Sequence, residues 1–227
     1  MQPDLVIFDL DGTLIDTAPD LIDSLNHTIA IRGLAPLTFG DLTHLVGHGA
    51  RAMIERAFRH RAVELDPDEI PGLQHVFIDH YRAGMPGKSQ PYPGLVAALE
   101  RLAADDIRLA VCTNKMESLA RDLISGLGMT DHFAAITGGD TFPVRKPDAG
   151  HILGTIAMAG GKPQRSIMIG DSVNDMLAAR NAGIASIAVP FGYSDVPVQT
   201  LGPSHVINHF DELNSGLVKQ LMAASGD

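Results

Sequence analysis

The stretch Leu5-Val6-Ile7-Phe8-Asp9-Leu10-Asp11-Gly12-Thr13 determines how the 227-residue sequence can be interpreted. Its opening apolar run predicts a short strand buried on both faces, as in a parallel sheet covered by helices. Two carboxylates and a glycine follow where that strand ends. Ligands of open α/β sheets bind beyond the carboxyl ends of the strands, so Asp9 and Asp11 are candidate site residues. In isolation, the same residues fit a solvated turn equally well, because Asp and Gly favour turns.

Further short apolar runs alternate with helical patterns along most of the chain. The predicted strands are Leu109 to Cys112, Ala134 to Thr137, Ser166 to Ile169 and Ser186 to Val189. The helical patterns between them are Leu95 to Leu102, Leu119 to Leu127, Ile152 to Ala159 and Met176 to Ala182. This alternation predicts a doubly wound α/β fold with a parallel sheet.

The segment from Thr17 to about Gln90 interrupts the alternation. Leu21, Leu25 and Ile29 recur every four residues and predict an amphipathic helix. Further helices are expected over Asp41 to Leu45, Ala50 to Phe58 and Asp68 to Tyr81. We therefore expect a core formed by residues 1–16 and 90–227, with an all-helical insertion over residues 17–89.

Composition excludes several classes of protein. A net charge of -10 disfavours nucleic acid as a partner. The sequence has neither a signal-peptide pattern nor an apolar run near the ~20 residues of a membrane span, so no membrane partner is expected. Its single cysteine, Cys112, cannot form an internal disulfide, which favours a reducing, cytoplasmic location. Monomer and homodimer remain equally open.

Chemically complementary residues follow the other predicted strands. Thr113 and Asn114 follow one strand, Asp171 and Asp175 follow another, and Lys146 lies in a loop between them. Each has an ordinary alternative, as a helix cap, a first-turn acid or a surface lysine. Their joint occurrence at strand ends favours a site.

The clustered charges indicate metal-assisted chemistry on a phosphate. Asp9, Asp11 and Asp171 would repel one another unless a divalent cation held them, and oxygen ligands suit Mg²⁺. Asp175 is either a further ligand or an orienting group. Lys146 would add positive charge for catalysis and phosphate binding, and Thr113 and the amides after Asp9, including that of Gly12, would donate to phosphate oxygens.

Two acids separated by one residue can divide a hydrolysis between them. A carboxylate can attack phosphorus and form an aspartyl-phosphate, while a second protonates the leaving alcohol and then activates water. Asp9 directly ends the strand and is the expected nucleophile. Asp11 is the expected general acid/base.

These motifs resemble those of the haloacid dehalogenase superfamily over essentially the whole chain. The carrying stretches are Asp9 to Thr17, Thr113-Asn114-Lys115, Lys146-Pro147 and Gly170 to Asp175. The resemblance implies a Rossmann-like core with a helical cap inserted after the first motif. It also implies that Asp9, the Asp11 backbone carbonyl and Asp171 bind Mg²⁺, and that Thr113 and Lys146 bind the phosphate of a small phosphomonoester. Asn114 is a further candidate for binding the phosphate.

Within the superfamily, further segments resemble bacterial phosphoglycolate phosphatases. They include Val46 to Ala50, Tyr92-Pro93-Gly94, Thr137 to Asp140 and Phe191-Gly192-Tyr193. Gly47-His48-Gly49 is the cap loop expected to reach the site, because its glycines allow close approach. His48 and Arg51 fit a solvated helix start equally well. Arg51 could instead bind a substrate carboxylate bidentately, as 2-phosphoglycolate would require.

Other activities on this scaffold remain open. A sugar phosphate, a nucleotide or pyrophosphate could be the substrate, and a phosphosugar mutase would use the same two aspartates. Asp11 argues against a dehalogenase, since those members lack the second acid. A phospho-accepting receiver domain gathers similar residues but has no use for a long helical insertion.

Overall fold

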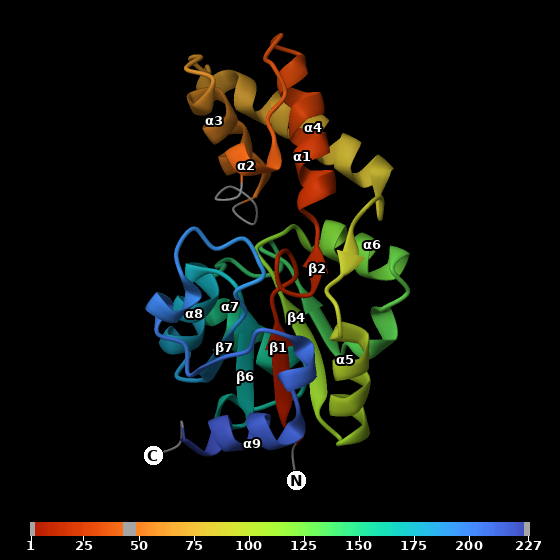
Figure 1. The fold of residues 1–227 in the computed structure, drawn as a ribbon, viewed down its shortest axis with the longest axis vertical. Helices are drawn as coiled ribbons and strands as arrows, with labels where there is room; N and C mark the ends of the chain where they lie inside the picture. Colours follow the sequence, from red (N-terminus) through yellow and green to blue (C-terminus); the bar gives the residue numbers. More distant parts are fainter. Residues whose placement is uncertain (1–2, 43–48, 225–227) are drawn as a thin grey trace.

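The computed structural model describes residues 3–42 and 49–224, and its centre is a six-stranded, fully parallel sheet (Figure 1). The strand order is β5-β4-β1-β6-β7-β8, so the first strand lies in the interior. The strands span Leu5–Phe8 (β1), Arg108–Cys112 (β4), Ala135–Thr137 (β5), Ser166–Gly170 (β6), Ala185–Ala188 (β7) and His205–Val206 (β8). The predicted doubly wound α/β fold is confirmed.

Helices cover both faces of this sheet. Side chains of β1 alternate, with Val6 and Phe8 in the cluster below one face and Leu5 and Ile7 in the cluster on the other. The first cluster includes residues of α5 (Leu95–Ala104), α6 (Glu117–Gly126) and α9 (Ser215–Ala224). The second includes residues of α7 (Ala149–Met158) and α8 (Val173–Asn181). Burial on both faces explains why the strand sequences are continuously apolar.

The helical insertion lies above the carboxyl ends of the strands (Figure 1). It consists of α1 (Ala18–Ala30), α2 (Phe39–Leu42), α3 (Ala50–His60) and α4 (Ile70–Gly84). Leu21, Leu25 and Ile29 of α1 are buried in a cluster with residues of α3 and α4. Of the helix expected over Asp41 to Leu45, the part after Leu42 lies outside the described residues.

Two very short strands join the insertion to the core. β2 (Ile15–Asp16) pairs antiparallel with β3 (Gln90–Pro91), with Ile15 opposite Pro91 and Asp16 opposite Gln90. The chain therefore enters and leaves the insertion at one place. Throughout residues 3–42 and 49–224, no helix combines the length and apolar character needed to cross a membrane.

Candidate active site

Three buried carboxylates lie together at the carboxyl end of the sheet. Asp9 directly follows β1, Asp171 directly follows β6, and Asp175 lies in the first turn of α8. One oxygen from each of these three residues lies within 4.8 Å of the others. Because β1 and β6 are hydrogen-bonded neighbours, their ends bring these three acids together.

Lys146 is the cation at the centre of this cluster. Its Nζ donates to Asp9 Oδ1 at 2.8 Å and to Asp175 Oδ1 at 2.6 Å. The side chain is 2% exposed. Burial alone would lower the pKa of Lys146, but the charges of Asp175 and Asp9 raise it, so the lysine is held as a cation.

A single lysine does not balance three carboxylates. Burial raises the pKa of Asp9 to about 7, against the opposing effect of Lys146. Burial together with the charges of Asp175 and Asp9 raises the pKa of Asp171 to about 8. The excess of buried negative charge and the oxygen-only donor set fit a hard divalent cation such as Mg²⁺.

Neighbouring groups fix Asp171 in position. Its Oδ1 accepts the Thr13 hydroxyl at 2.9 Å, and its Oδ2 accepts the Tyr193 N–H at 2.7 Å. Gly12 allows this approach: it has φ +81°, and a Cβ there would lie 2.6 Å from Asp171 Oδ2. The Gly12 N–H donates to the Ile15 carbonyl, whereas the N–H groups of Leu10 and Asp11 meet no acceptor within the described ranges.

Asp175 is committed to its own helix and to Lys146. Its Oδ2 accepts the N–H and the hydroxyl of Ser172, at 3.0 and 2.6 Å. Its Oδ1 accepts Lys146. With both oxygens occupied in this way, Asp175 is better placed to orient Lys146 than to offer a free ligand atom.

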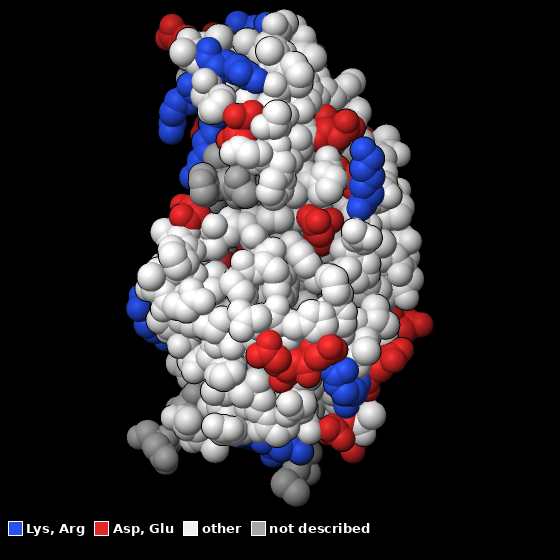
Figure 2. Space-filling model, viewed as in Figure 1, with Lys and Arg blue, Asp and Glu red and all other residues white. Residues whose placement is uncertain are grey.

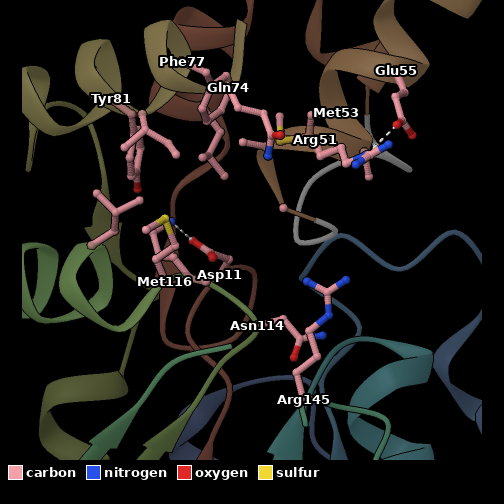
Figure 3. Close-up of a pocket in the computed structure, with 17 residues that line it drawn as sticks. Asp11, Arg51, Met53, Glu55, Gln74, Phe77, Tyr81, Asn114, Met116 and Arg145 are labelled. Atoms are coloured by element: carbon pink, nitrogen blue, oxygen red, sulfur yellow. Dashed lines mark hydrogen bonds and ion pairs between the residues drawn. The ribbon is translucent and has the colours of Figure 1, made fainter. Parts of the chain in front are cut away.

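Asp11 has a different environment from Asp9. Its Oδ1 accepts the Thr17 hydroxyl at 2.7 Å and the Lys115 Nζ at 2.8 Å. Lys115 also lies 4.5 Å from the ring centroid of Tyr81, on α4 of the insertion. Asp11 lines the pocket between the core and the insertion (Figure 3). Of the two acids of the first motif, Asp9 therefore lies in the carboxylate cluster, whereas Asp11 faces the pocket.

Thr113 and Asn114 end β4 beside this cluster. Thr113 Oγ1 accepts the Lys115 N–H at 3.1 Å, and its own proton is used by no acceptor in the part of the chain that the structure describes. Asn114 Nδ2 donates to the Lys146 carbonyl at 2.9 Å, so Asn114 braces the loop that carries the lysine. Asn114 Oδ1 is buried without a partner among the described residues.

The pocket above Asp11 has a volume of about 430 Å³. Residues of α3 and α4 line its upper side, and Asn114, Met116 and Arg145 line its lower side (Figure 3). Lys115 also lines the pocket. Arg51 pairs with Glu55 at 2.8 Å, and its side chain is 64% exposed. The guanidinium of Arg145 extends from the core toward the insertion (Figure 3) and has no charged partner within residues 3–42 and 49–224. His48 lies outside the described residues.

Cationic groups gather near this pocket despite the net charge of -10. Figure 2 shows Lys and Arg side chains along the edge of the insertion over α3, which carries Arg51, Arg56 and Arg59. Lys115 and Arg145 contribute from the core side. The local potential is therefore more favourable to an anion than the overall charge suggests.

Sequence reasoning left Thr13, Thr17, Lys115 and Tyr193 without roles, although it quoted all four in motifs. Thr13, Lys115 and Tyr193 each contact a site carboxylate from a distant position in the chain, and only the fold brings them together. For Thr17 a signal existed, because it stands six residues after Asp11 at the start of the insertion.

Comparisons with known proteins identify the family of this chain. The chain matches the family described as "Haloacid dehalogenase-like hydrolase" over residues 6–189. A relative named phosphoglycolate phosphatase, from Agrobacterium fabrum, is 61% identical over 219 residues, which cover 96% of this chain and 94% of the relative. Another of that name, from Mesorhizobium japonicum, is 49% identical over 226 residues, which cover 100% of both chains.

A solved structure is similar over nearly the same extent. It is the crystal structure of a predicted phosphoglycolate phosphatase from Haemophilus somnus 129pt, with a TM-score of 0.85 and 29% identity. The similarity covers 93% of this chain and 96% of that chain. The match over residues 6–189 and the extent of these similarities show that the chain belongs to the haloacid dehalogenase-like hydrolase family.

Proposed function

We propose that this phosphatase hydrolyses 2-phosphoglycolate through an aspartyl-phosphate on Asp9, with Mg²⁺ as cofactor. The observation that supports this mechanism is that the two aspartates of the first motif, Asp9 and Asp11, have different surroundings. Asp9 lies with Asp171 and Lys146, whereas Asp11 faces the pocket and is held by Thr17 and Lys115. Two carboxyl groups in different environments can take different roles in one reaction.

In the first step, a carboxylate oxygen of Asp9 attacks phosphorus, and the bond from phosphorus to the leaving oxygen breaks. Asp11 gives its proton to that oxygen, which leaves as the alcohol of glycolate. In the second step, Asp11 accepts a proton from water as the water oxygen attacks the phosphorus of the aspartyl-phosphate. The phosphorus–Asp9 bond breaks, inorganic phosphate is released, and both acids return to their starting states.

The chain's own donors would hold the phosphoryl group. The Thr113 hydroxyl and the N–H groups of Leu10 and Asp11, which have no acceptor among the described residues, would donate to its oxygens, and Lys146 would keep Asp9 ionised and oriented. Asp9, Asp171 and the Asp11 carbonyl would hold Mg²⁺, which when bound supplies positive charge to the phosphoryl oxygens. Asp175 would orient Lys146.

A guanidinium would recognise the carboxylate of the substrate. Arg51 is one candidate, provided that it exchanges Glu55 for the substrate. Arg145 is a second, because it lines the same pocket and immediately precedes Lys146. Residues 17–89 would act as a cap over this pocket and exclude water during turnover. The names of the relatives support 2-phosphoglycolate as the substrate.

The test is release of inorganic phosphate from a panel of phosphomonoesters, with and without Mg²⁺. The panel contains 2-phosphoglycolate, 3-carbon and sugar phosphates, a nucleotide and pyrophosphate. We expect 2-phosphoglycolate to rank first in kcat/KM, and Asp9→Asn to lose more than about 10³-fold. Substantial turnover by Asp9→Asn would exclude the covalent route, and a panel led by a sugar phosphate or nucleotide would exclude the substrate.

The same panel separates the two arginines. The responsible residue, changed to Ala, should lose about 10- to 100-fold in kcat/KM for 2-phosphoglycolate but little for an ester that has no carboxylate. Arg59→Ala, on the same helix as Arg51 but outside the pocket lining, is the matched control. If neither Arg51→Ala nor Arg145→Ala has this selective effect, the carboxylate is recognised elsewhere.

A further inference from the structure

We propose that the Tyr193 hydroxyl is a positioning group that aligns Asp11 for proton transfer by fixing the first connection between core and cap. The inference rests on the proposed function, in which Asp11 is the general acid. Tyr193 lies in the loop after β7, but its hydroxyl reaches the start of the insertion, more than 170 residues earlier in the chain. Its hydroxyl makes three hydrogen bonds there.

The hydroxyl uses its full hydrogen-bonding capacity on residues 16–18. It accepts the Thr17 N–H at 2.7 Å and the Ala18 N–H at 2.9 Å, and it donates to Asp16 Oδ1 at 2.6 Å. A hydroxyl has one proton and two lone pairs, so these three partners saturate it. Residues 16–18 are the link between β2 and α1.

Tyr193 thereby replaces the usual cap of helix α1. The first N–H groups of a helix lack internal acceptors, and a threonine at the N-cap normally satisfies one with its own oxygen. Thr17 occupies the N-cap of α1 but makes no side-chain bond to the helix. Its hydroxyl donates to Asp11 Oδ1 instead, at 2.7 Å. With Tyr193 as the cap, Thr17 is free to hold the acid.

The other end of Tyr193 is fixed in the catalytic cluster. Its N–H donates to Asp171 Oδ2 at 2.7 Å, and its ring lies so close to Gly12 that a Cβ there would be 2.7 Å from Cδ2. The residue is 6% exposed. One residue thus sets the distance between the Asp171 side of the site and the link that holds Asp11.

The test is Tyr193→Phe, which removes the hydroxyl but keeps the ring and the N–H to Asp171. Turnover is compared on 2-phosphoglycolate, whose alkoxide needs a proton to leave, and on p-nitrophenyl phosphate, whose phenolate does not. We expect kcat/KM, which reports formation of the aspartyl-phosphate and departure of the leaving group, to fall by about 10- to 100-fold on the first and by less than about 3-fold on the second. Thr17→Val should show the same selectivity, and the double variant should lose little more than either single one.

Controls separate positioning from general damage. Ser194→Ala changes the next residue, whose hydroxyl donates to the Val196 carbonyl of its own loop, and should keep both activities. Equal losses of kcat/KM by Tyr193→Phe on both esters, or no loss on either, would overturn the inference. Asp11→Asn provides the reference. If it lacks leaving-group selectivity, the proposed acid is wrong, whereas selectivity in Asp11→Asn but not in Tyr193→Phe refutes only the role of Tyr193.

Discussion

At the scale of single residues, His151 shows how the loop around Lys146 depends on a neutral side chain. Its Nδ1 accepts the Lys146 N–H at 3.3 Å, and the residue is fully buried. Nε2 has no partner within the described part of the chain. Burial, together with the positive charge of Lys146, lowers the pKa of His151 from 6.5 to about 4.

This shift predicts a pH-dependent stability. Below pH 6.5, His151 is protonated in the unfolded chain, whereas in the folded protein it is protonated only below about pH 4. The contribution of neutral His151 to the free energy of unfolding is therefore fully present above pH 6.5, and it is lost as the pH falls toward 4. Between about pH 7.5 and 5, we expect wild type to lose roughly 2 kcal/mol more than His151→Gln in urea unfolding.

An exposed histidine provides the matched control. His75 lies on α4 with its side chain 78% exposed, and His75→Gln should keep the pH dependence of wild type. If His151→Gln and His75→Gln behave alike, the buried histidine does not carry the effect.

At the scale of elements, two loops that follow neighbouring strands pack backbone against backbone. The Gly139 N–H donates to the Lys115 carbonyl at 2.7 Å. A Cβ on Gly138 would lie 2.2 Å from the Glu117 N and 2.6 Å from the Lys115 O. The loop after β5 therefore supports the segment that carries Thr113 and Lys115.

Gly138→Ala should push the loop after β5 away from the backbone of Lys115 and Glu117. Backbone atoms cannot yield as a flexible side chain would, so we expect a loss of about 1–3 kcal/mol in stability and a lower kcat/KM. Gly72→Ala is the control, since nothing lies within 4 Å of its Cβ and it stands in helix α4, where Ala is preferred. Urea unfolding and turnover check both variants; unchanged activity in Gly138→Ala would show that the loop adapts.

The elements that could be predicted from the sequence are those with a strong local pattern. β1, β4, β5, β6 and β7 are apolar runs, and α1 repeats its buried positions every four residues. β2, β3 and β8 have two residues each and exist only through their pairing, so no local pattern marks them. The acids at strand ends were predictable from the fold class, whereas the contact of Lys115 with Asp11 joins residues 104 apart.

At the scale of the whole molecule, the clustered carboxylates lower stability in the absence of a cation. Asp9, Asp171 and Asp175 are buried together with one lysine between them. Binding of Mg²⁺ to the folded state alone should raise Tm by about 5–10 °C at a concentration near 100 times its Kd. Chelation should reverse the shift.

Asp171→Asn should change both the stability of the metal-free protein and the rise in Tm on addition of Mg²⁺. Its amide can still accept the Tyr193 N–H and meet the Thr13 hydroxyl, while one buried charge is removed. We expect the Tm of the metal-free variant to equal or exceed that of wild type, with a Mg²⁺ shift below roughly 1 °C. Asp105→Asn, at an exposed position, should keep the full shift. A full Mg²⁺ shift in Asp171→Asn would place the cation elsewhere.

The pairing of β2 with β3 has a consequence for how such a protein can diversify. Ile15 lies opposite Pro91, so the two ends of the insertion are neighbours although some seventy-five positions separate them in the chain. Whatever is spliced between them need only start and finish at adjacent points, and the sheet below does not have to be rebuilt. Selectivity can then change by exchange of one contiguous genetic segment, while the residues that make and break the bond to phosphorus are inherited intact.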